Sequence, residues 1–254
     1  MGARGASFVT ALALSSARAH ALALHCAALQ TRDTTAEGAP PSWGLTEEGL
    51  AALQGADAPA AVLEVQSRLA KLYPEFTVCH LPGASLEADG QVAGAAVAPL
   101  VANAAVAGDC FGWHRDAQPA ELAPAAPWAE RHGLYYNREP GKPLLVSLIV
   151  YLNDAWKLDF DAETLFLDPA TGTGVIVRPQ PGRCVLMDAD LLHRLSPPSR
   201  AAGRPRYSLV WKLALVPKPL PRPRGADCPP PPPPCSIARP EWGIPLPFGS
   251  AAGY

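Results

Sequence analysis

The sequence predicts a mainly β domain, a barrel or jelly roll, preceded by helices and followed by a proline-rich tail. From about Thr77 onward, short apolar runs are separated by Gly and Pro, the pattern of several short strands joined by turns. Before this region apolar residues recur at helical spacing, and after it prolines dominate. The 254 residues suffice for one good-sized domain plus tails.

Residues 1–32 form an Ala/Leu-rich N-terminal segment with no acidic residue before Asp33. Three interpretations fit it: a helix packed on the domain, a transit peptide, or a secretory signal. A membrane span is disfavoured, because Arg18, His20 and His25 interrupt every apolar run long enough to cross. We expect a soluble protein, in the cytoplasm or in an organelle reached by a transit or signal peptide.

Residues 46–97 are expected to form a helical support region. Thr46 can cap a short helix over 46–53, and a firmer helix is predicted over 59–73, where Pro74 ends it. Its apolar stripe is Val62, Val65, Leu69 and Leu72. Such a stripe indicates a helix that packs its apolar face on a sheet.

Residues 98–217 carry most of the predicted strands. The expected strands are 76–80, 99–107, 111–115, 144–152, 164–167, 174–177, 183–187, 191–195 and 207–216. Residues 117–142 break this rhythm with four prolines around Trp128, Tyr135 and Tyr136. A loop of this length inside a domain often serves as a lid or a binding loop.

Residues 218–254 form a Pro-rich tail that cannot join a sheet and is expected to be disordered. A proline-motif-binding partner is one candidate ligand for the tail. The net charge of −2 gives no electrostatic case for nucleic acid. The six cysteines form no CxxC pair, so neither a disulfide framework nor a zinc site is indicated.

His114 and Asp116 lie one residue apart in a segment that reads as extended, so both side chains point to one face of a strand. Two histidines and one carboxylate form the facial triad of non-heme Fe(II) oxygenases. His193 lies far along the chain in an apolar, strand-like run. The sequence therefore supplies a candidate iron site, although each residue alone has an ordinary structural explanation.

Arg206 and Ser208 share one face of the last apolar strand. A buried Arg requires an anion, because an unpaired buried charge is prohibitive. A dicarboxylate co-substrate would supply it, since a guanidinium binds a carboxylate through two parallel hydrogen bonds. The alternative is an ion pair within the domain, with Asp188 or Asp190.

The order His-x-Asp, distant His and Arg-x-Ser resembles the 2-oxoglutarate- and Fe(II)-dependent oxygenases, and it is most similar to their prolyl-hydroxylase branch. The likeness covers about residues 98–216. Further elements that resemble this branch are residues 100–102 with Gly108, Tyr151-Leu152-Asn153 followed by Trp156, Pro181-Gly182-Arg183 before the distal His, and Trp211.

The resemblance implies a double-stranded β-helix (jelly roll) that binds Fe(II) through His114, Asp116 and His193. Arg206 would bind 2-oxoglutarate with Tyr151 and Ser208, with Arg204 as the alternative in a shifted register. O2 would be the second co-substrate, and ascorbate would sustain activity.

The implied reaction is hydroxylation of a C–H bond in a protein residue, with proline as the first expectation. The alternatives are the same chemistry on a small molecule, a demethylation, and a non-catalytic interaction module.

Three departures from the family pattern concern the co-substrate and substrate sites. Ala105 stands where the oxygen-sensing enzymes have a tyrosine, which Asn103 could replace. Residues 161–163 replace a Gly-Gly turn, and the segment between His193 and Arg206 is longer than usual. The candidate pocket walls are Trp113, Trp128 and Tyr136, all of which could equally be packing residues.

Overall fold

The computed structural model describes residues 58–81, 86 and 100–219, together with the backbone of β1 (Phe8–Val9), β2 (Thr31–Asp33) and β3 (Ser42–Leu45). The helix expected over 46–53 and the tail from residue 220 lie outside these residues. Of the segment 1–32, only β1 and the start of β2 are described. No helix within the described part of the chain is long and apolar enough to span a bilayer.

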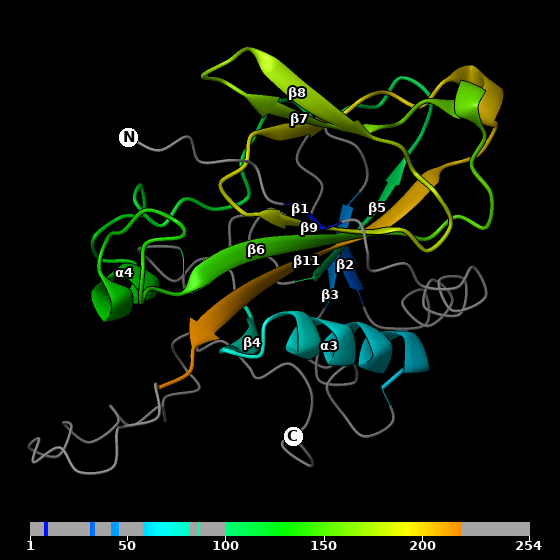
Figure 1. Cartoon of the computed structure of the whole chain (residues 1–254). Coiled ribbons are helices and arrows are strands. Elements are labelled where there is room, and N and C mark those ends of the chain that lie inside the picture. Colours follow the sequence, from blue (N-terminus) through cyan, green and yellow to red (C-terminus); the bar gives the residue numbers. More distant parts are fainter. Residues whose placement is uncertain are drawn as a thin grey trace, which may run out of the picture.

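The described strands form two antiparallel sheets (Figure 1). The larger sheet runs in the order β1-β9-β6-β11-β5-β3-β2, and β4 pairs with the far half of β11. The smaller sheet runs β10-β7-β8. The bounds are β4 Phe76–His80, β5 Leu100–Ala105, β6 Leu144–Tyr151, β7 Thr164–Asp168, β8 Thr173–Val177, β9 Cys184–Asp188, β10 His193–Leu195 and β11 Arg206–Pro217.

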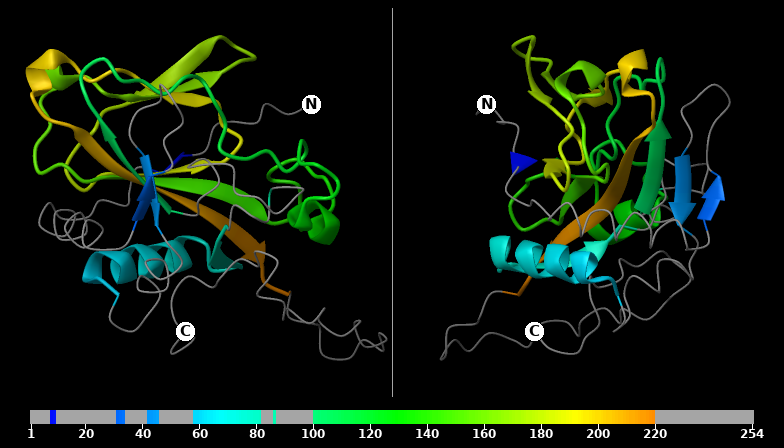
Figure 2. Two further views of the ribbon diagram at one scale, coloured as in Figure 1. Left: turned by 180° about the vertical axis from the view of Figure 1, so that it is seen from behind. Right: turned by 90° about the vertical axis from the view of Figure 1, so that its right-hand side faces the viewer.

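Helix α3 (Ala60–Leu72) covers one face of the larger sheet, and the smaller sheet lies against the other face (Figures 1 and 2). Side chains alternate between these faces along each strand. Two neighbours on β6 illustrate the alternation: Leu148 packs toward α3, whereas Ile149 packs with Phe166 and Val177 of the smaller sheet. This mainly β, two-sheet arrangement confirms the predicted fold class.

Helix α3 confirms the helix predicted over 59–73. Val62, Val65 and Leu69 are buried against the sheet, as their spacing predicts. Leu72 differs from the prediction: it is 46% exposed, because it is the last helical residue and lies at the end of the stripe. The helix ends at Leu72, and its C-cap Tyr73 lies directly before Pro74.

The strand predicted over 111–115 is wrong. Only His114 in this segment pairs with another strand, through an isolated antiparallel bridge to His193. The remaining residues form a bend and loop that returns to the larger sheet at Asp116, whose backbone N–H donates to the carbonyl of Ala189 over 2.8 Å. A single bridge therefore takes the place of the expected strand.

The long loop 117–142 contains a short helix that the sequence pattern did not predict, α4 (Pro127–His132). Proline is favoured in the first helical turn, where a missing N–H costs nothing. The end of the loop is fixed to the larger sheet: the side chain of Asn137 exchanges two hydrogen bonds of 2.9 Å with the backbone of Leu145. Arg138 binds the carboxylate of Asp188 through two guanidinium nitrogens.

The turn before β7 adopts a backbone that favours glycine, although it contains none. Asp161 has φ 55° and ψ −135°, and Ala162 has φ 63°. The Asp161 carbonyl accepts a 2.8 Å hydrogen bond from the Trp156 indole, and Asp161 also forms a bridge with Pro198. These contacts hold the residue in a conformation that costs an L-amino acid free energy.

We expect Asp161→Gly to raise the free energy of unfolding by about 1–2 kcal/mol, or several degrees in Tm, because glycine removes the strain. Thermal denaturation measures the change. Asp159→Gly is the matched control: Asp159 lies two residues earlier in a 3-10 helix and is not among the residues with positive φ, so glycine there should lower Tm. An equal fall in Tm in both variants would contradict backbone strain at Asp161.

Candidate metal centre

His114 and His193 are brought side by side by their backbones. Each backbone N–H donates to the carbonyl of the other residue over 3.0 Å. Residues paired in this way project their side chains to the same face. The two imidazole rings accordingly lie with their centroids 4.3 Å apart.

Both histidine rings present the same nitrogen to the site. Nδ1 of His114 lies 2.8 Å from the carbonyl of Gly112, and Nδ1 of His193 lies 2.9 Å from that of Leu191. A carbonyl only accepts, so in the neutral form of each ring Nδ1 carries the proton and Nε2 the lone pair. This is the tautomer and the backbone support that metal-binding histidines commonly have.

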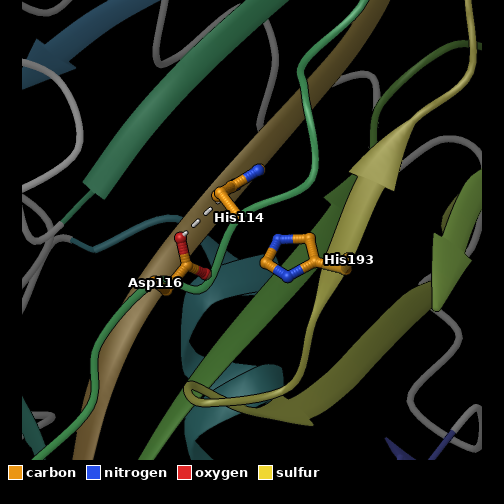
Figure 3. Close-up of side chains that lie close together, drawn as sticks. All are labelled: His114, Asp116 and His193. Atoms are coloured by element: carbon orange, nitrogen blue, oxygen red, sulfur yellow. Dashed lines mark ion pairs between the residues drawn. The ribbon is translucent and has the colours of Figure 1, made fainter. Parts of the chain in front are cut away.

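Asp116 completes the set (Figure 3). Its Oδ1 lies 4.0 Å from Nε2 of His114, and one donor atom from each of the three residues lies within 4.8 Å of the others. Its Oδ2 is buried without a hydrogen-bond partner among the described residues. An orphaned carboxylate oxygen beside two imidazole lone pairs fits a bound cation.

The charges of the site favour the ligating protonation states. Burial alone would raise the pKa of Asp116, but Lys212 and His193 hold that pKa below its ordinary value. Burial lowers the pKa of His193, so this ring is neutral at pH 7. A carboxylate and a neutral imidazole are the forms that bind a metal ion.

The donor set can close on a cation with little rearrangement. Two ligands bound at right angles about 2.1 Å from a divalent ion lie about 3 Å apart, so the donors need to approach by at most about 2 Å. The His114 side chain is 43% exposed, whereas that of Asp116 is 8% exposed. Two nitrogens and one oxygen on one side suit Fe(II).

A second polar cluster surrounds Arg206, which is 4% exposed. Its guanidinium donates to Oγ of Ser208 over 2.7 Å and to Oγ1 of Thr164 over 3.3 Å, and it lies 4.8 Å from the centre of the Tyr151 ring. The Tyr151 hydroxyl is 2.7 Å from that of Thr164. Nε of Arg206 is buried without a partner in the described chain.

Arg206 forms no ion pair with any acidic residue that the structure describes. The two acids considered from the sequence are engaged elsewhere: Asp188 binds Arg138, and Asp190 accepts a hydrogen bond from Asn137. Arg204, the alternative in a shifted register, lies on the surface and binds Asp154 over 2.8 Å. Of these two arginines, Arg206 is therefore the one that is buried.

The remaining candidates are placed as follows. Trp113 is 42% exposed and stacks on Arg194, 5.1 Å from ring to guanidinium. Trp128 is buried and donates to the Tyr135 hydroxyl over 2.9 Å, and Tyr136 is 62% exposed. Their roles as pocket walls stay predictions.

Asn103 and Ala105 lie on β5, beside the strand that carries Arg206. Asn103 is buried and pairs in register with Ser208, whereas Ala105 pairs with Arg206. Asn103 is thus on the strand face expected for a residue that replaces the missing tyrosine. That replacement also stays a prediction.

Sequence reasoning missed two polar residues of the site, Thr164 and Lys212. Lys212 lies 3.6 Å from Oδ1 of Asp116. The available signal was spacing: Lys212 shares strand parity with Arg206 and Ser208 in an otherwise apolar run. Thr164 carried no such signal, because its contacts come from the other sheet.

Comparison with known proteins gives matches among solved structures alone: no family model and no curated protein matches the chain. A prolyl-4-hydroxylase from Pseudomonas putida is 16% identical, with 85% of this chain and 95% of that chain covered and a TM-score of 0.47. A 2OG-Fe(II) oxygenase-family oxidoreductase from Burkholderia pseudomallei is 13% identical, with 85% and 89% covered and a TM-score of 0.48.

A third similar structure is the non-heme alpha ketoglutarate dependent epimerase SnoN from nogalamycin biosynthesis. It is 14% identical, with 95% of this chain and 90% of that chain covered and a TM-score of 0.49. Likeness at these values does not assign a function. The function has to be inferred from the site residues themselves.

We expect Co(II), a stable stand-in for Fe(II), to raise the Tm of the chain by about 5–10 °C at a hundredfold excess over its Kd. Asp116→Ala should abolish this rise, because it removes the one charged ligand. Asp168→Ala, which changes an exposed carboxylate on β7, should keep it. An equal rise in both variants would place the metal elsewhere.

Proposed function

We propose that the chain is an Fe(II)- and 2-oxoglutarate-dependent dioxygenase that hydroxylates a C–H bond. The carrying observation is the combination of a metal-ready His114/Asp116/His193 set with a buried Arg206 that has no acidic partner in the described chain. The first binds a divalent ion, and the second requires an anion. A ligand that meets both needs has a chelating end and a carboxylate end, as 2-oxoglutarate has.

The spacing of the two clusters suits a five-carbon dicarboxylate. On β7, Phe166 pairs with His193, and its ring lies 6.1 Å from the imidazole. Thr164, which accepts from Arg206, lies two residues along the same strand and on the same face. Two residues span about 6.7 Å of strand, a gap that an extended 2-oxoglutarate can bridge.

Each residue has a defined task in this proposal. His114, Asp116 and His193 would hold the iron, which would supply the chemistry with 2-oxoglutarate and O2. Arg206 would bind the distal carboxylate through two hydrogen bonds, with the Ser208 and Thr164 hydroxyls beside it. The bound iron would supply the oxidation of 2-oxoglutarate and substrate; the protein orients both and excludes water.

The proposed substrate is a protein residue, with proline as the first to test. This choice rests on the sequence resemblance to the prolyl-hydroxylase branch. A small-molecule substrate would use the same metal and co-substrate residues, so peptide and metabolite panels distinguish the two.

We expect the chain to release succinate from 2-oxoglutarate in the presence of Fe(II), ascorbate and O2. Asp116→Ala should reduce the rate to background, because it removes a metal ligand, whereas Asp168→Ala should keep it. A succinate assay measures both. Equal rates for Asp116→Ala and the unmodified chain would exclude the dioxygenase.

We expect Arg206→Ala to raise the KM for 2-oxoglutarate by about a hundredfold, the loss of one or two charge-assisted hydrogen bonds. Co(II) affinity should change little, because Arg206 is no metal ligand. Arg204→Ala is the matched control: it removes a surface Arg two residues away on the chain and should leave the KM unchanged. The reverse result would assign the carboxylate to Arg204.

A further inference from the structure

Lys212 is a buried lysine inside the larger sheet, 3% exposed. It lies on β11 at the point where pairing with β5 ends, at Trp211, and pairing with β4 begins, at Leu213. Its carbonyl accepts a 3.0 Å hydrogen bond from the N–H of Leu81. Its side chain shares a face with Arg206, toward the metal ligands and away from α3.

The contact that Lys212 makes there is with a proposed metal ligand. Its Nζ lies 3.6 Å from Oδ1 of Asp116, and no other acidic residue that the structure describes lies within 4.0 Å of it. Both side chains are almost fully buried, at 4% and 8% exposure. Oδ2 of Asp116 has no hydrogen-bond partner in the described chain.

A buried carboxylate without a counter-ion is strongly unfavourable, and a metal ion relieves this cost only once it is bound. In the metal-free chain Lys212 supplies the compensating charge. We propose that Lys212 is a positioning residue that holds the Asp116 carboxylate in its ligating orientation before the metal arrives. It does so at the expense of metal affinity, because its charge repels the incoming cation.

This inference rests on the proposed metal centre and deepens it. The variant Lys212→Met tests it, because methionine keeps most of the aliphatic stem and removes the charge. The probe is Co(II), whose visible absorption reports its coordination and needs no turnover. The metal-free Tm and the Kd for Co(II) are measured on the full chain.

We expect Lys212→Met to lower the metal-free Tm and to tighten Co(II) binding by at least about tenfold. Tenfold corresponds to the repulsion between a unit charge and a divalent ion roughly 6 Å apart at the dielectric constant of water, and the lower dielectric constant of a buried site increases it. Lys212→Arg should restore both values toward those of the unmodified chain. Lys142→Met is the matched control: Lys142 donates to the carbonyl of His132 over 2.7 Å, outside the metal set, so Co(II) affinity should stay unchanged.

A second comparison decides the case if Lys212→Met does not fold. In an Asp116→Asn background Lys212 is a buried charge without a counter-ion, so adding Lys212→Met should raise Tm. A fall in Tm there, or unchanged Co(II) affinity in Lys212→Met, would show that the side chain only fills space and would overturn the inference. Absence of Co(II) binding by the unmodified chain would instead remove the metal centre, and the role of Lys212 with it.

Discussion

The two backbone hydrogen bonds between His114 and His193 are the contact on which the site depends. They join a loop to the first residue of β10, and no continuous strand supports the loop at that point. Through them, two side chains from distant parts of the sequence share one face. Asp116 follows two residues later and is fixed separately by the carbonyl of Ala189. Three candidate ligands are thus positioned by three backbone hydrogen bonds.

The two faces of β11 have different tasks. Toward α3 the strand presents Leu209, Trp211 and Leu213, which build the core. Toward the smaller sheet it presents Arg206 and Lys212, two buried cations. Burying their charges costs free energy, and a hydrophobic core does not need them. The charge of Lys212 is compensated by Asp116, whereas Arg206 has only hydroxyl groups as hydrogen-bond partners within the described chain. Both charges lie on the face that carries the proposed metal and co-substrate sites.

Much of the fold could be predicted from the sequence, because hydrophobic periodicity reports burial directly. It marked α3 and the long strands β6 and β11, whose side chains alternate between two buried faces. It failed over 111–115, where it predicted a strand and the chain forms only an isolated bridge at His114. The three candidate ligands were named from a spacing and order that resemble the oxygenases, whereas Thr164 was missed because its partners lie on another sheet and nothing local distinguishes it.

The two histidines differ in their access to solvent, and this difference would give exchange of the proposed metal a direction. His193 is 6% exposed, whereas the side chain of His114 is 43% exposed. In the proposed metal centre, His114 would be the ligand nearest to solvent, and Asp116 and His193 the more deeply placed ones. A chelator would approach from the same side. Loading and loss of the proposed metal would therefore share the side on which His114 is exposed.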